Sequence, residues 1–174
     1  GFACATGYYA GRKAAKAALA TDWTAYDPED VKKEQQRLYA PLSVDPDEGM
    51  TWKELNMAIA KAMQNYCGGV KCDALLREGL DLLTTFEKEM VPKLSCQNPH
   101  ELMRAHEVLD ILTVAKMVLY ASLTRKSSSA PLCFTRSDYP EMDPEKDRHH
   151  IAIHQENGEV KVRNVPLDFF GELK

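Results

Sequence analysis

The side chains best suited to chemistry in this chain are three histidines near its C-terminus, His149, His150 and His154. Imidazole is a common metal ligand, so the spacing of these residues decides whether they could share one ion. On a strand His150 and His154 share a face but stand about 13 Å apart, because a strand rises about 3.3 Å per residue. One ion cannot span that distance without a bend, and no cysteine or further histidine lies at ligand spacing. We therefore expect no metal site, and a small metalloprotein built on these histidines is the weakest functional hypothesis.

The cysteines form a second group of reactive side chains: Cys4, Cys67, Cys72, Cys96 and Cys133. Their number is odd, their spacing is irregular and no CxxC pair occurs, which is typical of reduced thiols in a cytoplasmic protein. Cys67 and Cys72 flank a Gly-Gly pair, where a thiol pair or a metal site is an alternative to two unrelated cysteines at helix ends. We favour the unrelated cysteines and expect a cytoplasmic protein.

The segment 136–140 (RSDYP) combines a charge pair, an aromatic ring and a proline. Taken alone, it predicts a tight turn with an interaction between Arg136 and Asp138, with part of a binding surface as the alternative. His100 and His106 fall on a predicted helix, where we interpret them as a first-turn residue and a groove residue. We therefore expect no catalytic residue in this chain.

The composition is that of an ordinary soluble domain. The chain has 174 residues, 44% hydrophobic and 28% charged, which is enough for one domain with a real core. A net charge of -4 gives no basic footprint for nucleic acid, and no run of about 18 apolar residues could span a membrane. The chain shows no signal peptide. It starts with glycine rather than methionine, and its first residues resemble the middle of a longer sequence, so we expect a fragment.

A long helix predicted from Asn98 to about Thr124 organises the elements that position these side chains. Asn98 is a favoured N-cap, a proline follows at the first helical position, and Glu101 can reach back to the cap. Apolar residues recur at steps of three and four in two adjacent rows: Ala105, Leu109, Leu112, Ala115 and Leu119, and beside them Val108, Ile111, Ala115 and Val118. A stripe this wide predicts that the helix is flanked on more than one side.

Two further helices precede the long one. Thr51 and Glu54 form a capping box that starts a helix ending at a Gly-Gly pair. A second helix runs from about Cys72 to Met90 with leucines in register. Together the three predict a mainly α fold, an antiparallel up-down-up three-helix bundle that resembles a spectrin repeat.

The two ends of the chain differ from this bundle. Residues 5–20 predict a helix with alanines and glycines along one face, which suits close approach to a sheet or another backbone. Asp27 caps a short helix that runs to about Tyr39. Near the C-terminus, alternating apolar residues on either side of Asn157-Gly158 predict a β-hairpin within an irregular tail.

Three short segments carry a family resemblance: residues 4–15 (CATGYYAGRKAA), 125–128 (RKSS) and 136–143 (RSDYPEMD). The first resembles the last helix of the FAD domain in the fumarate reductase and succinate dehydrogenase flavoprotein family, which includes L-aspartate oxidase and the adenylylsulfate reductase α subunit. The other two resemble the segment that follows this family's helical domain. Between these motifs the family carries a three-helix bundle, in the order and spacing found here.

Several positions depart from the family pattern. The family often has glutamate at the position of Ser127 and histidine at that of Phe134, and Ser129-Ala130 replaces its Arg-Gly. The resemblance is therefore to a divergent subfamily, and the substrate need not be succinate or fumarate.

The resemblance implies a division of the chain into three parts. Residues 1–22 would be the last helix of an FAD-binding domain, residues 23–125 a helical bundle domain, and residues 126–174 a C-terminal loop and hairpin. The whole protein would be an FAD-dependent oxidoreductase, and the alternative is a free-standing helical protein-interaction module with no redox role.

In the family the flavin sits at the N-terminus of the Gly-Arg helix, so the backbone of Ala3, Cys4 and Ala5 would lie nearest to it. The resemblance also implies that Arg136 and Asp138 brace this region against the flavin domain. The carboxylate-binding residues and the glycine-rich FAD loop lie upstream in the family. This chain alone is therefore expected to hold no FAD and to be inactive, with the upstream FAD-binding domain and an iron–sulfur subunit as implied partners.

Overall fold

A computed structural model describes residues 1–22 and 25–167 of the chain. The chain divides into two compact units, Gly1–Arg37 and Leu38–Lys174. The predicted domain boundary between residues 22 and 23 lies next to residues 23–24, which are outside the described residues. The end of the predicted C-terminal segment, residues 168–174, is also outside them.

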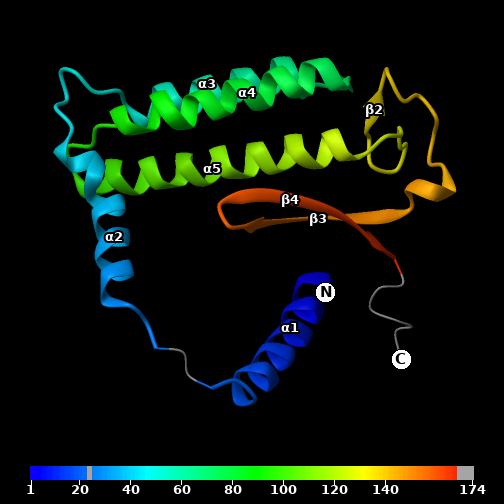
Figure 1. The fold of residues 1–174 in the computed structure, drawn as a ribbon, viewed down its shortest axis with the longest axis horizontal. Helices are drawn as coiled ribbons and strands as arrows, with labels where there is room; N and C mark the ends of the chain where they lie inside the picture. The colour runs from blue at the N-terminus through cyan, green and yellow to red at the C-terminus, as the bar shows by residue number, and fades with distance from the viewer. Residues whose placement is uncertain (23–24, 168–174) are drawn as a thin grey trace. The chain divides into compact units, whose positions relative to one another are not determined.

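The first unit contains the small-residue helix, α1, which runs over Phe2–Leu19 (Figure 1). It begins three residues earlier than the sequence predicts, with Gly1 at its N-cap position. None of its residues is buried. Helix α2, Pro28–Tyr39, crosses the boundary between the units, and the Asp27 carboxylate accepts a hydrogen bond of 2.9 Å from the Glu29 N–H at its start.

The three predicted helices of the bundle are present in the second unit: α3 (Trp52–Tyr66), α4 (Asp73–Glu89) and α5 (Pro99–Thr124). The predicted capping box forms, since the Thr51 hydroxyl accepts from the Glu54 N–H and the Glu54 carboxylate accepts from the Thr51 N–H at 2.7 Å. The Asn98 side chain accepts from the Glu101 N–H at 3.0 Å. Each helix contacts the other two, which confirms the three-helix bundle. A short 3-10 turn, Ala40–Ser43, precedes α3 in a stretch that carries no helical pattern in the sequence. A second one, Val91–Lys93, follows α4.

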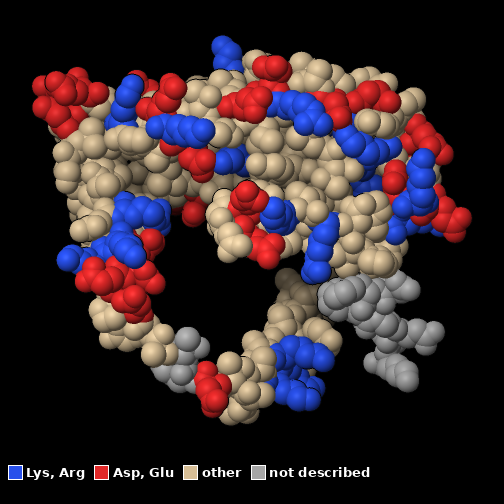
Figure 2. Space-filling view, in the orientation of Figure 1, with Lys and Arg blue, Asp and Glu red and all other residues tan. Residues whose placement is uncertain are grey.

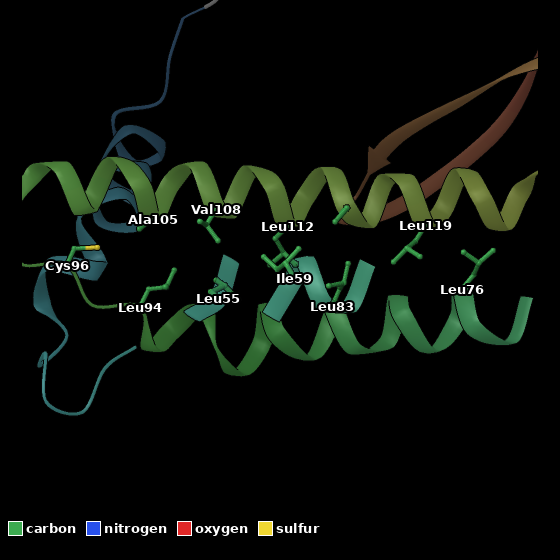
Figure 3. Packing of buried hydrophobic residues seen from close by; sticks show 12 residues of the cluster. Leu55, Ile59, Leu76, Leu83, Leu94, Cys96, Ala105, Val108, Leu112 and Leu119 are labelled. Carbon is green, nitrogen blue, oxygen red and sulfur yellow. The ribbon is translucent and has the colours of Figure 1, made fainter. Parts of the chain in front are cut away.

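The core lies between these helices, and Figure 3 shows side chains of α5 pointing toward those of α3 and α4. Its buried members are Leu55, Ile59, Ala62, Leu76, Leu83, Leu94, Cys96, Ala105, Val108, Leu112, Ala115 and Leu119. Complete burial of one leucine side chain contributes about 1.5–3 kcal/mol, so this cluster supplies the main driving force of the fold. Gly79 allows the close approach of α4 to α3, because a Cβ atom there would lie 2.7 Å from the Tyr66 Cβ.

The C-terminal part carries the predicted hairpin, strands β3 (His149–Glu156) and β4 (Glu159–Pro166). They pair antiparallel in the register Ile153↔Val162, and both contact α5. Asn157 and Gly158 have φ values of 51° and 82°, as a two-residue turn with both residues left-handed requires.

A second, parallel pair joins β1 (Val70–Lys71) to β2 (Thr135–Arg136), and no sequence pattern predicts it. A further short 3-10 turn, Glu145–Asp147, precedes β3. None of the helices in the described ranges combines the length and the hydropathy that a bilayer crossing requires.

Candidate functional site

The most highly connected polar group in the described part of the chain is Arg136, whose side chain is 0% exposed. Two backbone contacts place it. Strand β2 pairs Arg136 with Lys71, and the Arg136 N–H donates to the Ser128 hydroxyl oxygen at 2.9 Å. Residues 128 and 136 are thereby held at the end of the bundle where α5 finishes and α4 begins.

The guanidinium of Arg136 uses all of its N–H groups within this chain. Nε and one terminal nitrogen donate to the Asp138 carboxylate at 2.8 and 2.7 Å. The other terminal nitrogen donates to the backbone carbonyls of Ser122 and Arg125 at 2.7 and 3.0 Å, which satisfies acceptors at the C-terminus of α5. A further hydrogen bond joins Arg136 to the Asp73 carboxylate. Arg136 therefore satisfies the five-donor geometry of its side chain completely.

Asp138 and Asp73 link this arginine to the start of α4. Cys72 is the N-cap residue of α4 but makes no capping bond, and Asp138 accepts from the Asp73 N–H at 2.8 Å in its place. The Asp73 carboxylate also accepts from the Lys126 ammonium at 2.9 Å. Hydrogen bonds from Arg136 hold the pKa of Asp138 well below its usual range, and the hydrogen bond from Lys126, with a further contribution from Arg136, lowers the pKa of Asp73.

An aromatic ring completes this group. The Tyr139 ring centroid lies 4.9 Å from the Arg136 guanidinium carbon and 5.0 Å from the Lys126 ammonium. We call Asp73, Lys126, Arg136, Asp138 and Tyr139 the Arg136 cluster. Its charges neutralise one another, and the guanidinium has no N–H left for a ligand. It ties α4, α5 and the tail together.

The Arg136 cluster confirms one prediction made from the sequence. The predicted Arg136–Asp138 interaction is present. The expected brace of Arg136 and Asp138 against a flavin domain stays a prediction, and every N–H group of the Arg136 guanidinium binds an acceptor of this chain. Sequence reasoning missed Asp73 and Lys126, since their separation from Arg136 leaves no local pattern.

The first turn of α1 contains the residues predicted to lie nearest a flavin. The Ala5 N–H donates to the Gly1 carbonyl at 3.0 Å, so it forms the first hydrogen bond of the helix. The N–H groups of Ala3 and Cys4 precede that bond and point out of the helix end. No acidic residue lies in this turn, and all of its side chains are exposed. Such a helix end favours a negatively charged group.

The histidines and cysteines of the second unit are dispersed. His150 and His154 stand opposite Val165 and Lys161 in the hairpin. His154 lines a groove of about 370 Å³ between the hairpin, α4 and α5. Among the described residues, no group of three His, Cys, Asp or Glu side chains could hold a metal ion.

All five cysteines are free thiols. Burial raises the pKa of Cys96, which belongs to the core. The Cys67 sulfur lies 3.9 Å from the Ser122 hydroxyl rather than in a pair with Cys72. His106 contacts the Leu38 carbonyl at 2.9 Å and anchors α5, in keeping with a structural role.

Residues 56–171 match the family model described as the fumarate reductase flavoprotein C-terminus. A search of the curated proteins gave no significant match.

Two solved structures illustrate the fold similarity. One is Mycobacterium smegmatis Sdh1 in complex with UQ1, with a TM-score of 0.65 and 21% identity over 83% of this chain and 25% of that chain. The other is a variant of E. coli quinol fumarate reductase FrdA, with a TM-score of 0.70 and 19% identity over 86% of this chain and 26% of that chain. At these identities the similarity shows the fold alone, and the chain spans about a quarter of the length of either relative.

Proposed function

The chain belongs to the fumarate reductase flavoprotein C-terminal family, and we propose that it is the C-terminal region of an FAD-dependent oxidoreductase whose flavin-binding domain precedes it. The observation that carries this proposal is the family match over residues 56–171, which covers most of α3, all of α4 and α5, and the hairpin. The bundle and the Arg136 cluster would serve as a rigid scaffold. The cofactor-binding loop and the catalytic side chains would lie in the preceding part.

Helix α1 supports this proposal because its surface suits a larger protein. Helix α1 has 18 residues and no buried side chain, whereas tertiary contacts usually stabilise short helices in water. We propose that residues 1–22 form the last helix of the FAD-binding domain. Alanines and glycines along one face would then allow close contact with that domain.

The first turn of α1 fits the edge of a flavin that carries negative charge. When bound, FAD would supply the capacity to accept or donate a hydride. Ala3 and Cys4 would direct their backbone N–H groups toward it, and the helix dipole would favour the reduced, negatively charged form. Ala5 would contribute less, because its N–H already bonds Gly1 within the helix.

The free-standing interaction module remains the second proposal. The second unit favours it, because Leu55, Leu83, Leu119 and their neighbours give that unit a core of its own. The family match weighs against it, since the family model describes the C-terminal part of a flavoprotein. We also propose a cytoplasmic location and an iron–sulfur protein as electron partner, supported by the free thiols and by the family.

The test is to purify the protein encoded by the native gene, including everything that precedes Gly1. We expect stoichiometric flavin, seen as visible absorbance that is bleached by dithionite and restored by an oxidant. The 174-residue chain alone is the matched control and should bind no flavin. A native polypeptide with no flavin, or tight FAD binding by the chain alone, would contradict the proposal.

A further inference from the structure

Helix α5 is covered on three sides by parts of its own unit. Helix α3 lies on one side, where Cys67 faces Ser122. Helix α4 lies on the next, where the Lys116 ammonium is 2.6 Å from the Glu87 carboxylate. The hairpin lies on the third, where Met117 contributes with Ile153 and Val160 to the groove described above.

The fourth side of α5 is apolar and uncovered. Ile111, Val114 and Val118 are 45%, 57% and 41% exposed, and their spacing of three and four residues puts them in one row. Met117 lies at the edge between this row and the hairpin groove and is 43% exposed. The sequence predicts that α5 is flanked on more than one side, and its contacts with α3, α4 and the hairpin confirm this prediction. The row formed by Ile111, Val114 and Val118 nevertheless has no cover in its own unit.

Charge is confined to the N-terminal part of this face, where Glu107 and Asp110 precede Ile111 and Val114 by four residues. Between Asp110 and Arg125 the only charged residue is Lys116, and that side chain is paired with Glu87 on the α4 side. The helices α3 and α4 differ, since Figure 2 shows Lys, Arg, Asp and Glu side chains gathered along their outer surface. An apolar row of this kind on one helix, beside charged neighbours, marks a surface that another protein segment covers.

We propose that Ile111, Val114, Met117 and Val118 form the docking surface for the preceding, flavin-binding part of the same polypeptide. This inference rests on the proposed function. The chain covers 25% of the Sdh1 chain, so most of such a polypeptide is available as an intramolecular partner. Because these four side chains carry no charge, the part of the segment that contacts them must itself be apolar.

The size of the surface favours an intramolecular partner over a second copy of this chain. A stable complex between separate proteins buries about 800 Å² per partner, from about 20–30 residues. Four half-exposed side chains provide far less. A partner in the same polypeptide has a high effective concentration, so a small apolar contact is enough to hold it.

Methionine oxidation in the full-length protein tests this assignment with an internal control. Met57 on α3 is 69% exposed and Met117 is 43% exposed, so exposure alone predicts peroxide oxidation rates within about twofold. If the surface is covered, Met57 should oxidise at least about tenfold faster than Met117, as measured by mass spectrometry of peptides. Equal rates in the folded protein would overturn the proposal.

Two variants sharpen the result. Val114→Lys places a charge on the surface without disturbing the bundle core, and it should bring the Met117 rate to within about twofold of the Met57 rate. Lys53→Gln, a change on the exposed surface of α3, should leave Met117 protected. Protection of Met117 that persists in Val114→Lys would overturn the assignment.

Two controls separate this inference from other outcomes. Protection that disappears on dilution would assign the surface to a second copy and overturn the proposal. The flavin content of the same sample is measured separately by its absorbance. Bound flavin together with a rapidly oxidised Met117 would refute the docking surface and leave the proposed function standing. Protection in a polypeptide without flavin would support an intramolecular cover while the proposed function fails.

Discussion

Removal of the Arg136 guanidinium should destabilise this chain more than any surface change. Arg136→Met keeps much of the aliphatic length but leaves Asp73 and Asp138 without their buried partner. It also leaves the carbonyls of Ser122 and Arg125 without two hydrogen bonds. Loss of one partner from a buried ion pair costs about 3–5 kcal/mol. The two carboxylates are 30% and 29% exposed, so water recovers part of that loss and we expect about 3 kcal/mol.

This effect is large against a total stability of about 5–15 kcal/mol, and it should lower Tm by about 10 °C. The assay is urea unfolding of the 174-residue chain followed by far-UV circular dichroism. Arg104→Met is the matched control, because Arg104 pairs with Glu107 at 2.7 Å while both side chains are more than 40% exposed. That change should cost less than about 1 kcal/mol.

Arg136→Lys separates charge from geometry. Lysine keeps the positive charge but cannot reproduce the fork that binds two carboxylates and two carbonyls at once, so its cost should approach that of Arg136→Met. If Arg136→Met proved no more destabilising than Arg104→Met, the claim that Arg136 holds the end of the bundle together would be refuted.

Three further predictions concern the same scaffold. The pKa of Asp138 is lowered by folding, so its contribution should be fully present above the unfolded value of about 3.9 and should be lost as pH falls toward the folded value. Acid unfolding of Asp138→Asn should therefore depend less on pH than that of the parent, and identical profiles would count against the ion pair. Gly79→Ala should cost about 1–3 kcal/mol in urea unfolding, because its Cβ would lie 2.7 Å from the Tyr66 Cβ, whereas Gly69→Ala meets no atom within 4 Å and should be tolerated. Asn98→Ala removes the cap of α5 and should cost about 1 kcal/mol in the same assay, and no loss would show that the cap is dispensable.

The sequence by itself determined the elements whose causes are local. The Thr51 capping box, the Asn98 cap and the apolar periodicity each act within a few residues, and the three helices of the bundle lie where these patterns predict. The Asn157-Gly158 turn likewise predicts the hairpin, because few residues tolerate two successive left-handed conformations. The ordered motifs at the two ends of the chain were enough to indicate the family that the match over residues 56–171 shows.

Tertiary structure alone decided what the polar residues of the candidate site do. Arg136 reads in the sequence as half of a local turn with Asp138, yet it also binds Asp73, and Asp138 caps a helix that begins far away in the chain. The exposed side of α5 was likewise invisible, because Ile111 and Leu112 are equally apolar in sequence while only the latter is buried. Local patterns report what a residue's backbone neighbours favour. Burial and long-range pairing depend on which distant segments the folded chain brings together.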